Sequence, residues 1–156
     1  MGLNLRFKLG YDLGNPTAVN QTESTPLSDA DAHSRAMTIP IHRVVYELID
    51  LLGLTLVAAI GGVNETRAVV QWLDSRKPQK PQVLRFTLQL ALMISGPSDG
   101  TVARSWLQGS NPYLGDRSPA MLLRHRPLDE IQAPVMEAAR EFAVRSSLVK
   151  TRHESQ

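Results

Sequence analysis

One segment of twenty residues, 104–123, constrains the fold of this chain more than any other part of it. Its sequence is RSWLQGSNPYLGDRSPAMLL, in which two apolar stretches flank a cluster of Gly, Ser, Asn and Pro. Apolar residues around its start recur at helical spacing and predict one buried face: Val102, Ala103, Trp106 and Leu107. Gly109 then ends this first helix, so the segment predicts two helices that meet at a tight corner.

The turn inside this segment has a specific chemistry at each step. Asn111-Pro112 holds the chain extended, Gly115 supplies a positive φ, and Asp116 can accept bonds from backbone N–H groups. Ser118-Pro119 suits the start of the second helix, with Ser as N-cap and Pro at the first position, where its missing N–H costs nothing. A corner that serves only packing explains these residues one by one, so only their joint order points to a function.

Five short motifs follow one another in this segment: Trp106-Leu107, Asn111-Pro112, Leu114-Gly115, Pro119 and Leu122-Leu123. In this order they resemble the toxin-binding domain of the Xre/MbcA/ParS antitoxins. The resemblance implies an all-α protein with no chemistry of its own, which binds a cognate RES-domain, NAD-consuming toxin and blocks the entrance of its active site. It also implies that the protein binds its own operator DNA. The toxin-binding residues expected here are Asn111, Tyr113, Leu114, Arg117, Met121, Arg124 and Arg126.

Length and composition agree with a helical protein and exclude several classes. A chain of 156 residues has room for one compact domain or two small ones, and few aromatic residues beside plentiful Leu, Ala and Val favour helices over sheets. The absence of Cys excludes disulfides, thiolate nucleophiles and zinc-finger sites. We expect a cytoplasmic protein without a membrane partner, because no signal peptide is recognisable and the longest nearly apolar run, 51–63, is too short to span a bilayer.

The first half contains a candidate helix-turn-helix region, 39–80, after a polar stretch, 1–38, that we expect to be a flexible arm. Apolar residues at helical spacing begin after Pro40 and predict the first helix of this region. Met37 comes just before this helix, so translation could start at Met1 or at Met37. Within 39–80, Thr55 is expected to cap a helix over 56–60, which Gly61-Gly62 ends, and a helix over 65–73 follows. This part resembles the Xre-like DNA-binding region, although the spacing from Val63 to Trp72 is one residue longer than in the usual repressor motif.

DNA contact, if it occurs, is expected from the second of these helices and the connector after it. Residues 61–98 carry five Lys or Arg against two Asp or Glu, which a solvated charge run and a phosphate-binding edge explain equally well. Arg67 is the best placed to reach a base edge. The full expected set is Asn64, Thr66, Arg67, Gln71, Arg76, Lys77 and Lys80.

A connecting helix, 81–98, is expected between the two halves. Its apolar part, 83–94, has one thin polar stripe formed by Gln82, Arg85 and Gln89. A helix with so narrow a stripe must be buried against both halves of the chain or against a second copy, so a homodimer is open. The resemblance to the antitoxins implies a toxin–antitoxin hetero-oligomer as the other possible assembly.

The toxin-binding domain is expected over 99–146, with a tail at 147–156 that frays. Its last helix is expected over 129–145, beginning near Ala133 so that Pro134 falls in the first turn. The inward residues of this helix are expected to be Ile131, Val135, Ala138, Ala139 and Phe142. Either the corner or residues 145–156 would then block the toxin.

No motif for catalysis or metal binding is present. The four His, at positions 33, 42, 125 and 153, have no partner at metal-ligand spacing, and phosphate-loop and nucleophile-elbow motifs are absent. We therefore expect no enzyme, no metal site and no cofactor. Two alternative functions stay open. One is a stand-alone helix-turn-helix transcriptional regulator with a C-terminal dimerisation domain, and the other is an enzyme with a pocket that no motif reveals.

Overall fold

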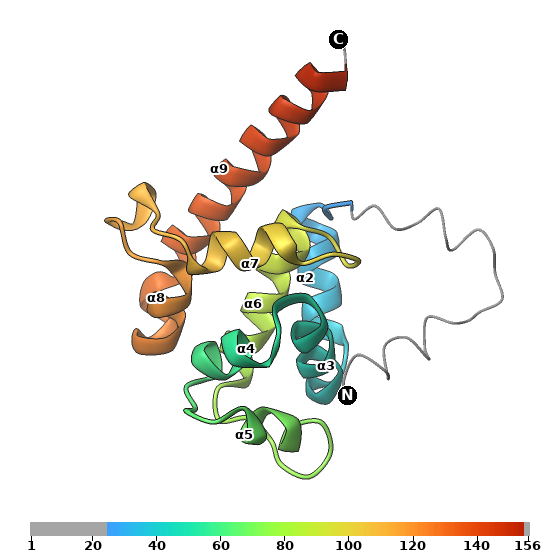
Figure 1. Cartoon of the computed structure of the whole chain (residues 1–156), viewed down its shortest axis with the longest axis vertical. Helices are drawn as coiled ribbons and strands as arrows, with labels where there is room; N and C mark the ends of the chain where they lie inside the picture. Colours follow the sequence, from blue (N-terminus) through green and yellow to red (C-terminus); the bar gives the residue numbers. More distant parts are fainter. Residues whose placement is uncertain (1–24, 155–156) are drawn as a thin grey trace, which may run out of the picture.

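The computed structural model describes residues 25–154, so the first 24 residues of the expected arm lie outside it (Figure 1). Within this range the prediction of an all-α fold is confirmed, and no described helix is both long and apolar enough to cross a membrane. The elements are α2 (Asp29–Thr38), α3 (Ile41–Leu52), α4 (Leu54–Gly61), α5 (Thr66–Gln71), α6 (Pro81–Ile94), α7 (Thr101–Gln108), the 3-10 helix η3 (Pro112–Leu114), α8 (Pro119–His125) and α9 (Leu128–Glu154).

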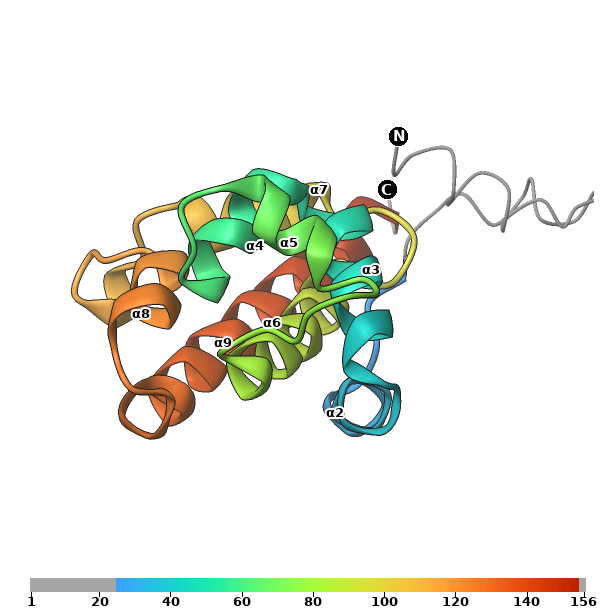
Figure 2. The same cartoon turned by 90° about the horizontal axis from the view of Figure 1, so that it is seen from below.

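Helix α6 lies at the centre of the molecule, between α2 and α9 (Figure 2). Every residue from Val83 to Ile94 except Arg85 is buried, and α3, α4 and α7 also pack against this helix. One hydrophobic cluster extends from Ala32 to Ala139. The expected connecting helix is therefore the shared core of both halves, and the cover that its apolar faces require comes from the same chain.

The polar stripe of α6 is covered by α2. Arg85 Nη1 donates to the carbonyl oxygens of Ala36 (2.8 Å) and Ile39 (2.7 Å), at the end of α2, where helical carbonyls lack partners within the helix. Gln89 is buried as well, whereas Gln82 is exposed. Because the stripe is satisfied within one copy of the chain, the observation that favoured a dimer through α6 no longer supports one.

Helix α2 corrects the expectation of a flexible arm over 1–38. Ser28 caps its start, since the Ser28 hydroxyl accepts a hydrogen bond from Asp31 N (3.2 Å). The only buried residues of this helix are Ala32 and Ala36. A helix that packs through two alanines has no pattern of large apolar residues, so the sequence periodicity could not reveal it.

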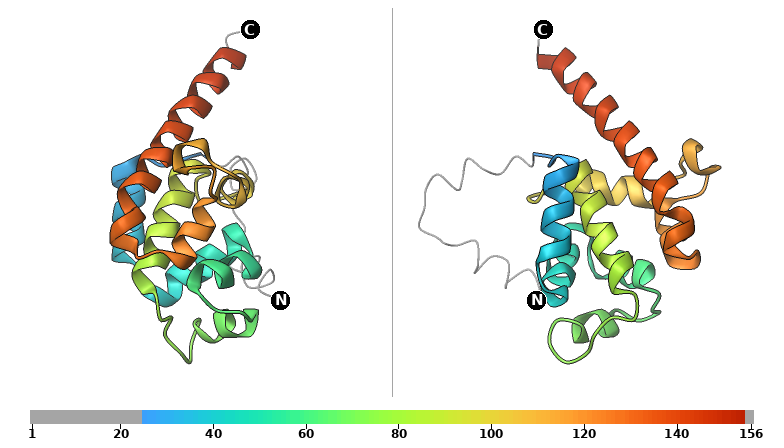
Figure 3. Two further views of the ribbon diagram at one scale, coloured as in Figure 1. Left: turned by 90° about the vertical axis from the view of Figure 1, so that its left-hand side faces the viewer. Right: turned by 180° about the vertical axis from the view of Figure 1, so that it is seen from behind.

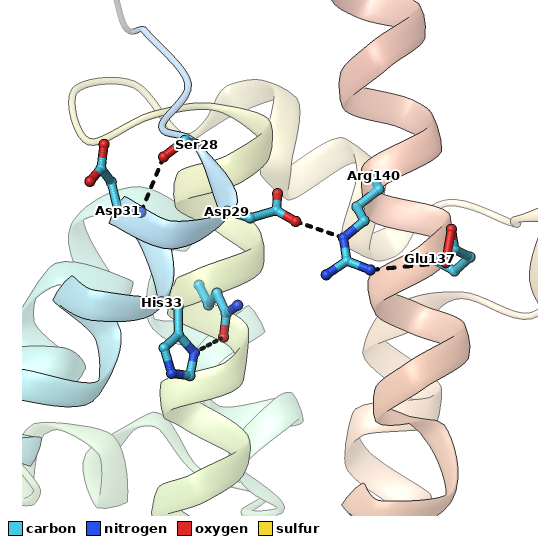
Figure 4. A network of polar contacts seen from close by, with 7 residues as sticks. Ser28, Asp29, Asp31, His33, Glu137 and Arg140 are labelled. Atoms are coloured by element: carbon cyan, nitrogen blue, oxygen red, sulfur yellow. Dashed lines mark hydrogen bonds and ion pairs between the residues drawn. The ribbon is translucent and has the colours of Figure 1, made fainter.

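Polar contacts also connect α2 with α9 and α6 (Figure 4). Arg140 Nε on α9 lies 2.6 Å from Asp29 Oδ2, and Glu137 is a second, more distant partner of the same guanidinium. On α6, Gln89 Oε1 lies 3.4 Å from His33 Nδ1. Hydrogen bonding to Asp29 raises the pKa of Arg140. Both groups of the ion pair are half exposed, so packing of α2 on α6 contributes more to its position than this pair does.

Two short helices, α4 and α5, occupy the region in which the helix-turn-helix is expected. Gly53, with φ 87°, ends α3 and directly precedes α4, which therefore begins at Leu54. Thr55 lies inside this helix and is not its cap, contrary to the prediction. Gly62 ends α4 in the left-handed conformation, with φ 84°, which glycine adopts readily.

Helix α5 is shorter than predicted, since it covers Thr66–Gln71 and not 65–73. Val69 and Trp72 are buried. The indole ring of Trp72 packs directly on α4 at Gly61. A Cβ atom at position 61 would lie only 2.7 Å from this ring, which is too close for a normal contact. The glycine at position 61 therefore allows the close approach that holds α5 against α4.

Helix α7 joins the second half to the same core. Ala103, Trp106 and Leu107 are buried as predicted, and the Trp106 ring centroid lies 6.4 Å from that of Phe142 on α9. Val102 is 48% exposed, so its predicted place on the buried face is wrong.

Helix α9 is longer than predicted at both ends, because it covers Leu128–Glu154 and not 129–145. Residues 147–154 are helical and do not form the expected frayed tail. Pro134 lies in the helix interior, where it removes the bond to the Glu130 carbonyl; both residues are exposed, so water can replace that bond. Ile131, Val135, Ala138 and Ala139 are buried as predicted, and Phe142 is partly buried against the same core. Met136, which was not predicted to face inward, is buried as well.

The first prediction concerns a chain that starts at Met37. Such a chain lacks residues 29–36 of α2, which uncovers one side of α6 and removes the Ala36 carbonyl that accepts from Arg85, so we expect the free energy of unfolding to fall by at least about 2 kcal/mol. Urea unfolding followed by circular dichroism measures this change. A chain that starts at Thr25 keeps every described element and is the matched control; equal stability of the two truncated chains would contradict the assigned role of α2.

Candidate binding surfaces

The corner, defined here as residues 109–126, is fixed by its own backbone. Asn111 N donates to Arg117 O (3.2 Å) in an isolated antiparallel bridge, and Asn111 Oδ1 accepts from Tyr113 N (2.9 Å). Asn111 and Leu114 are each only 7% exposed. Both were expected at the toxin-binding surface, but their side chains are buried. They stabilise the conformation of the corner and are not exposed to a partner.

The tip of the corner has the predicted turn chemistry at Gly115 and at Ser118-Pro119. Gly115 has φ 67°, and Asp116 after it has φ 63°, a left-handed conformation that Asp tolerates better than most residues. Ser118 Oγ then accepts a hydrogen bond from Met121 N (3.2 Å), with Pro119 at the first position of α8. These contacts set the direction in which α8 leaves the turn.

Four of the predicted toxin-binding residues are exposed on the corner. Tyr113 is 55% exposed and Met121 is 52% exposed, and Arg117 and Arg126 are exposed beside them in sequence. Arg126 makes an exposed ion pair with Glu130 (2.9 Å), of a kind that contributes little to stability. The corner therefore presents an aromatic ring, a methionine and cationic side chains to the solvent.

Tyr113 also contacts α9. Arg145 Nη2 donates to the Tyr113 hydroxyl (2.7 Å), and the guanidinium carbon lies 5.8 Å from the centroid of the ring. Arg145 Nε also forms an ion pair with Glu141 Oε1 (3.1 Å), one helical turn earlier on α9. Hydrogen bonding to Glu141 and the nearby Tyr113 hydroxyl raise the pKa of Arg145. No sequence signal connects positions 113 and 145, so sequence analysis missed this contact.

The last turns of α9 project beyond the body of the molecule (Figure 3). All residues from 144 to 149 are exposed, including three large apolar side chains: Val144 (58%), Leu148 (65%) and Val149 (66%). Val144 and Leu148 are one helical turn apart and so are neighbours on the helix surface. Sequence analysis missed this free end, although the spacing of these two residues is a signal for it.

The predicted DNA-binding residues separate into two groups. Helix α5 lies at the opposite end of the molecule from the free end of α9 (Figure 1). The Arg67 side chain is exposed on this helix, and its Nη2 atom lies 3.4 Å from Glu65 Oε1 in an exposed ion pair. Of the predicted residues along this helix and the connector, Thr66, Arg67, Arg76 and Lys77 are exposed and Gln71 is half-buried.

The second group lies between the two halves. Lys80 Nζ donates to the carbonyl oxygens of Leu123 (3.0 Å) and Arg124 (2.8 Å) on α8. Arg124 Nη2 donates in turn to Asn64 Oδ1 (2.9 Å). Burial and the neighbouring Arg124 guanidinium lower the pKa of Lys80. Lys80 is thus directed to α8 and not to a phosphate, and Arg124 is directed to the turn before α5 and not to a partner.

Among residues 25–154 no group of three or more His, Asp or Glu is placed to hold a metal ion. Comparisons of the chain with protein-family models, with curated proteins and with solved structures find no match. The chemistry of the two exposed surfaces, together with the resemblance of the corner sequence, is therefore the basis for a functional proposal.

The second prediction separates scaffold from surface on the corner. Trp106→Ala leaves a large cavity in the core and is expected to lower the free energy of unfolding by about 3–5 kcal/mol. Tyr113→Ala removes an exposed ring and is expected to change it by less than about 0.5 kcal/mol. Thermal and urea unfolding measure both effects, and a large loss for Tyr113→Ala would show that its ring is needed for folding.

Proposed function

We propose that this protein is an antitoxin that binds an RES-domain, NAD-consuming toxin and blocks its active site. The observation that carries the proposal is the exposed pair Tyr113 and Met121 on a corner that its own hydrogen bonds hold in place. The class of the toxin comes from the resemblance of the corner sequence to the Xre/MbcA/ParS antitoxins. Binding in this way needs no catalytic residue in the chain.

The corner has the composition of an energetically important contact. Aromatic residues, methionine and arginine are enriched at the centres of protein interfaces, and exposed apolar side chains gain free energy when a partner removes them from water. The backbone of the corner is already ordered by contacts of Asn111 and Ser118. Less conformational entropy is therefore lost on binding than for a flexible loop.

The free end of α9 supplies a second contact for the same partner. It lies next to the corner through the Arg145–Tyr113 hydrogen bond, and its three exposed apolar side chains have no cover within the described chain. A toxin could therefore be blocked by the corner itself or by residues 145–156 entering its active site. The experiment below distinguishes these two modes.

The third prediction tests the corner by coexpression with the toxin of the neighbouring gene. Tyr113→Ala and Arg117→Glu should abolish growth rescue while circular dichroism shows an unchanged helical signal, because both side chains are exposed and outside the core. Val102→Ala is the matched control, since Val102 is a similarly exposed apolar residue at the other end of α7. It should rescue growth as the wild type does.

Two outcomes would change this assignment. Full rescue by both corner variants would remove the corner as the binding site. If rescue is instead lost when residues 146–156 are deleted, the end of α9 blocks the toxin and the corner only positions it. Pull-down of the toxin by each variant separates loss of binding from loss of inhibition.

We also propose that α5 binds the operator of the protein's own gene. The support is the exposed Arg67 at the start of α5, with Arg76 and Lys77 exposed on the connector after it. An arginine of this kind can read a base edge, whereas connector cations contact phosphates. Helix α6, whose narrow polar stripe favoured a homodimer, is covered within one chain, so it gives no support to the alternative of a stand-alone regulator that dimerises.

The fourth prediction concerns this DNA contact. Arg67→Ala should weaken binding to the upstream promoter by about 1–3 kcal/mol, and Lys77→Ala should weaken binding to all sequences alike. Arg140→Ala removes the same charge from α9, away from α5, and is the control for net charge. Gel-shift titrations at two salt concentrations measure these effects. Absence of any shift by the wild type at low salt would end the DNA-binding proposal.

A further inference from the structure

Two cations join the corner to the helix-turn-helix. Arg124 Nη1 on α8 donates to the carbonyl oxygens of Ala59 (2.8 Å) and Val63 (3.3 Å), and its Nη2 donates to Asn64 Oδ1 (2.9 Å). In the other direction, Lys80 Nζ, just before α6, donates to the last carbonyls of α8. We call these contacts the Lys80–Arg124 cluster.

Each cation in the cluster caps a helix of the other half. The Ala59 carbonyl belongs to the last turn of α4, and the Leu123 and Arg124 carbonyls belong to the last turn of α8, where helical carbonyls have no partner within the helix. A positive charge also interacts favourably with the negative end of a helix dipole. These acceptors offset the repulsion between the two adjacent cations.

The cluster adjoins the proposed toxin-binding surface directly. Helix α8 has only seven residues, and Met121 and Arg124 are three positions apart, so they are neighbours on its surface. The Met121 side chain is half exposed, while the Arg124 guanidinium reaches the turn between α4 and α5. Leu122 and Leu123 fix the opposite face of α8 in the core. A partner that contacts Met121 therefore lies beside the residue that orders this turn.

We propose that the Lys80–Arg124 cluster couples partner binding on α8 to the position of α5. Binding of a partner to the corner then changes the affinity of α5 for DNA. This inference rests on the proposed function for its partner, but the mechanical connection is a property of the chain alone. Coupling between two sites is reciprocal, so a ligand on α5 changes the affinity of the corner by the same factor.

The connection is tested first on the isolated full-length protein by amide hydrogen exchange. Gly62 and Val63 donate their N–H groups to carbonyls at the end of α4, so their exchange reports opening of the turn. Arg124→Met keeps the apolar stem but removes the guanidinium, and should increase exchange of these two amides by about tenfold. Arg126→Met, which loses only an exposed ion pair, should leave them unchanged.

A second variant covers the case in which Arg124→Met does not fold. Lys80→Met leaves every Arg124 contact in place but removes the donor at the end of α8, so exchange of the Arg126 amide, which donates to the Leu122 carbonyl, should increase. Unchanged exchange at positions 62 and 63 in a folded Arg124→Met protein, or at position 126 in Lys80→Met, would overturn the connection.

The coupling is then tested with the toxin of the neighbouring gene. In the wild type, bound toxin should slow exchange of the Gly62 and Val63 amides by about fivefold or more, and in Arg124→Met, which lacks the contacts between α8 and this turn, this slowing should be lost. Equal slowing in both proteins, or none in a wild type that retains the toxin, would overturn the coupling. A wild type that does not retain the toxin would instead contradict the proposed function, while the exchange of the isolated variants still decides the connection.

Discussion

Because eleven of the fourteen residues of α6 are buried, the chain must surround this helix on nearly every side. Five other helices do so, and each is placed by what it covers. Helix α2 covers the polar stripe, where Arg85 finds two carbonyl acceptors, and the remaining helices cover apolar side chains. An uncovered α6 would expose more apolar surface than a small domain can offset, so the positions of all other elements depend on this burial.

This arrangement places the exposed surfaces on different parts of one molecule with a single hydrophobic cluster. Helix α5 lies at one end and the free end of α9 at the other, while the corner lies at the side of the molecule between them (Figure 1). The Lys80–Arg124 cluster crosses between them, because α8 packs on α4 as well as carrying Met121. The two halves therefore share a core and a set of helix caps, so neither is an independent domain.

Local features were predictable where local chemistry decides them. The Ser118 cap, the positive φ of Gly115, the end of α4 at Gly62 and the buried face with Trp106 each follow from a few neighbouring residues. The helix α2 was not predictable, because its two buried alanines give no periodic signal. The exposed Tyr113 and Met121 were correctly placed, whereas Asn111, Leu114, Lys80 and Arg124 were assigned to surfaces that they do not face.

The sequence by itself determined that the chain is helical, where α4 and α7 end, and that a tight turn separates α7 from α8, because caps, glycines and apolar spacing act within a few residues. Only the tertiary structure decided what covers α6, which cations face inward, and that Tyr113 meets Arg145. Those contacts join positions about thirty to sixty-five apart in the chain. No short-range pattern encodes such pairs, since they form only when packing of the core brings distant helices together.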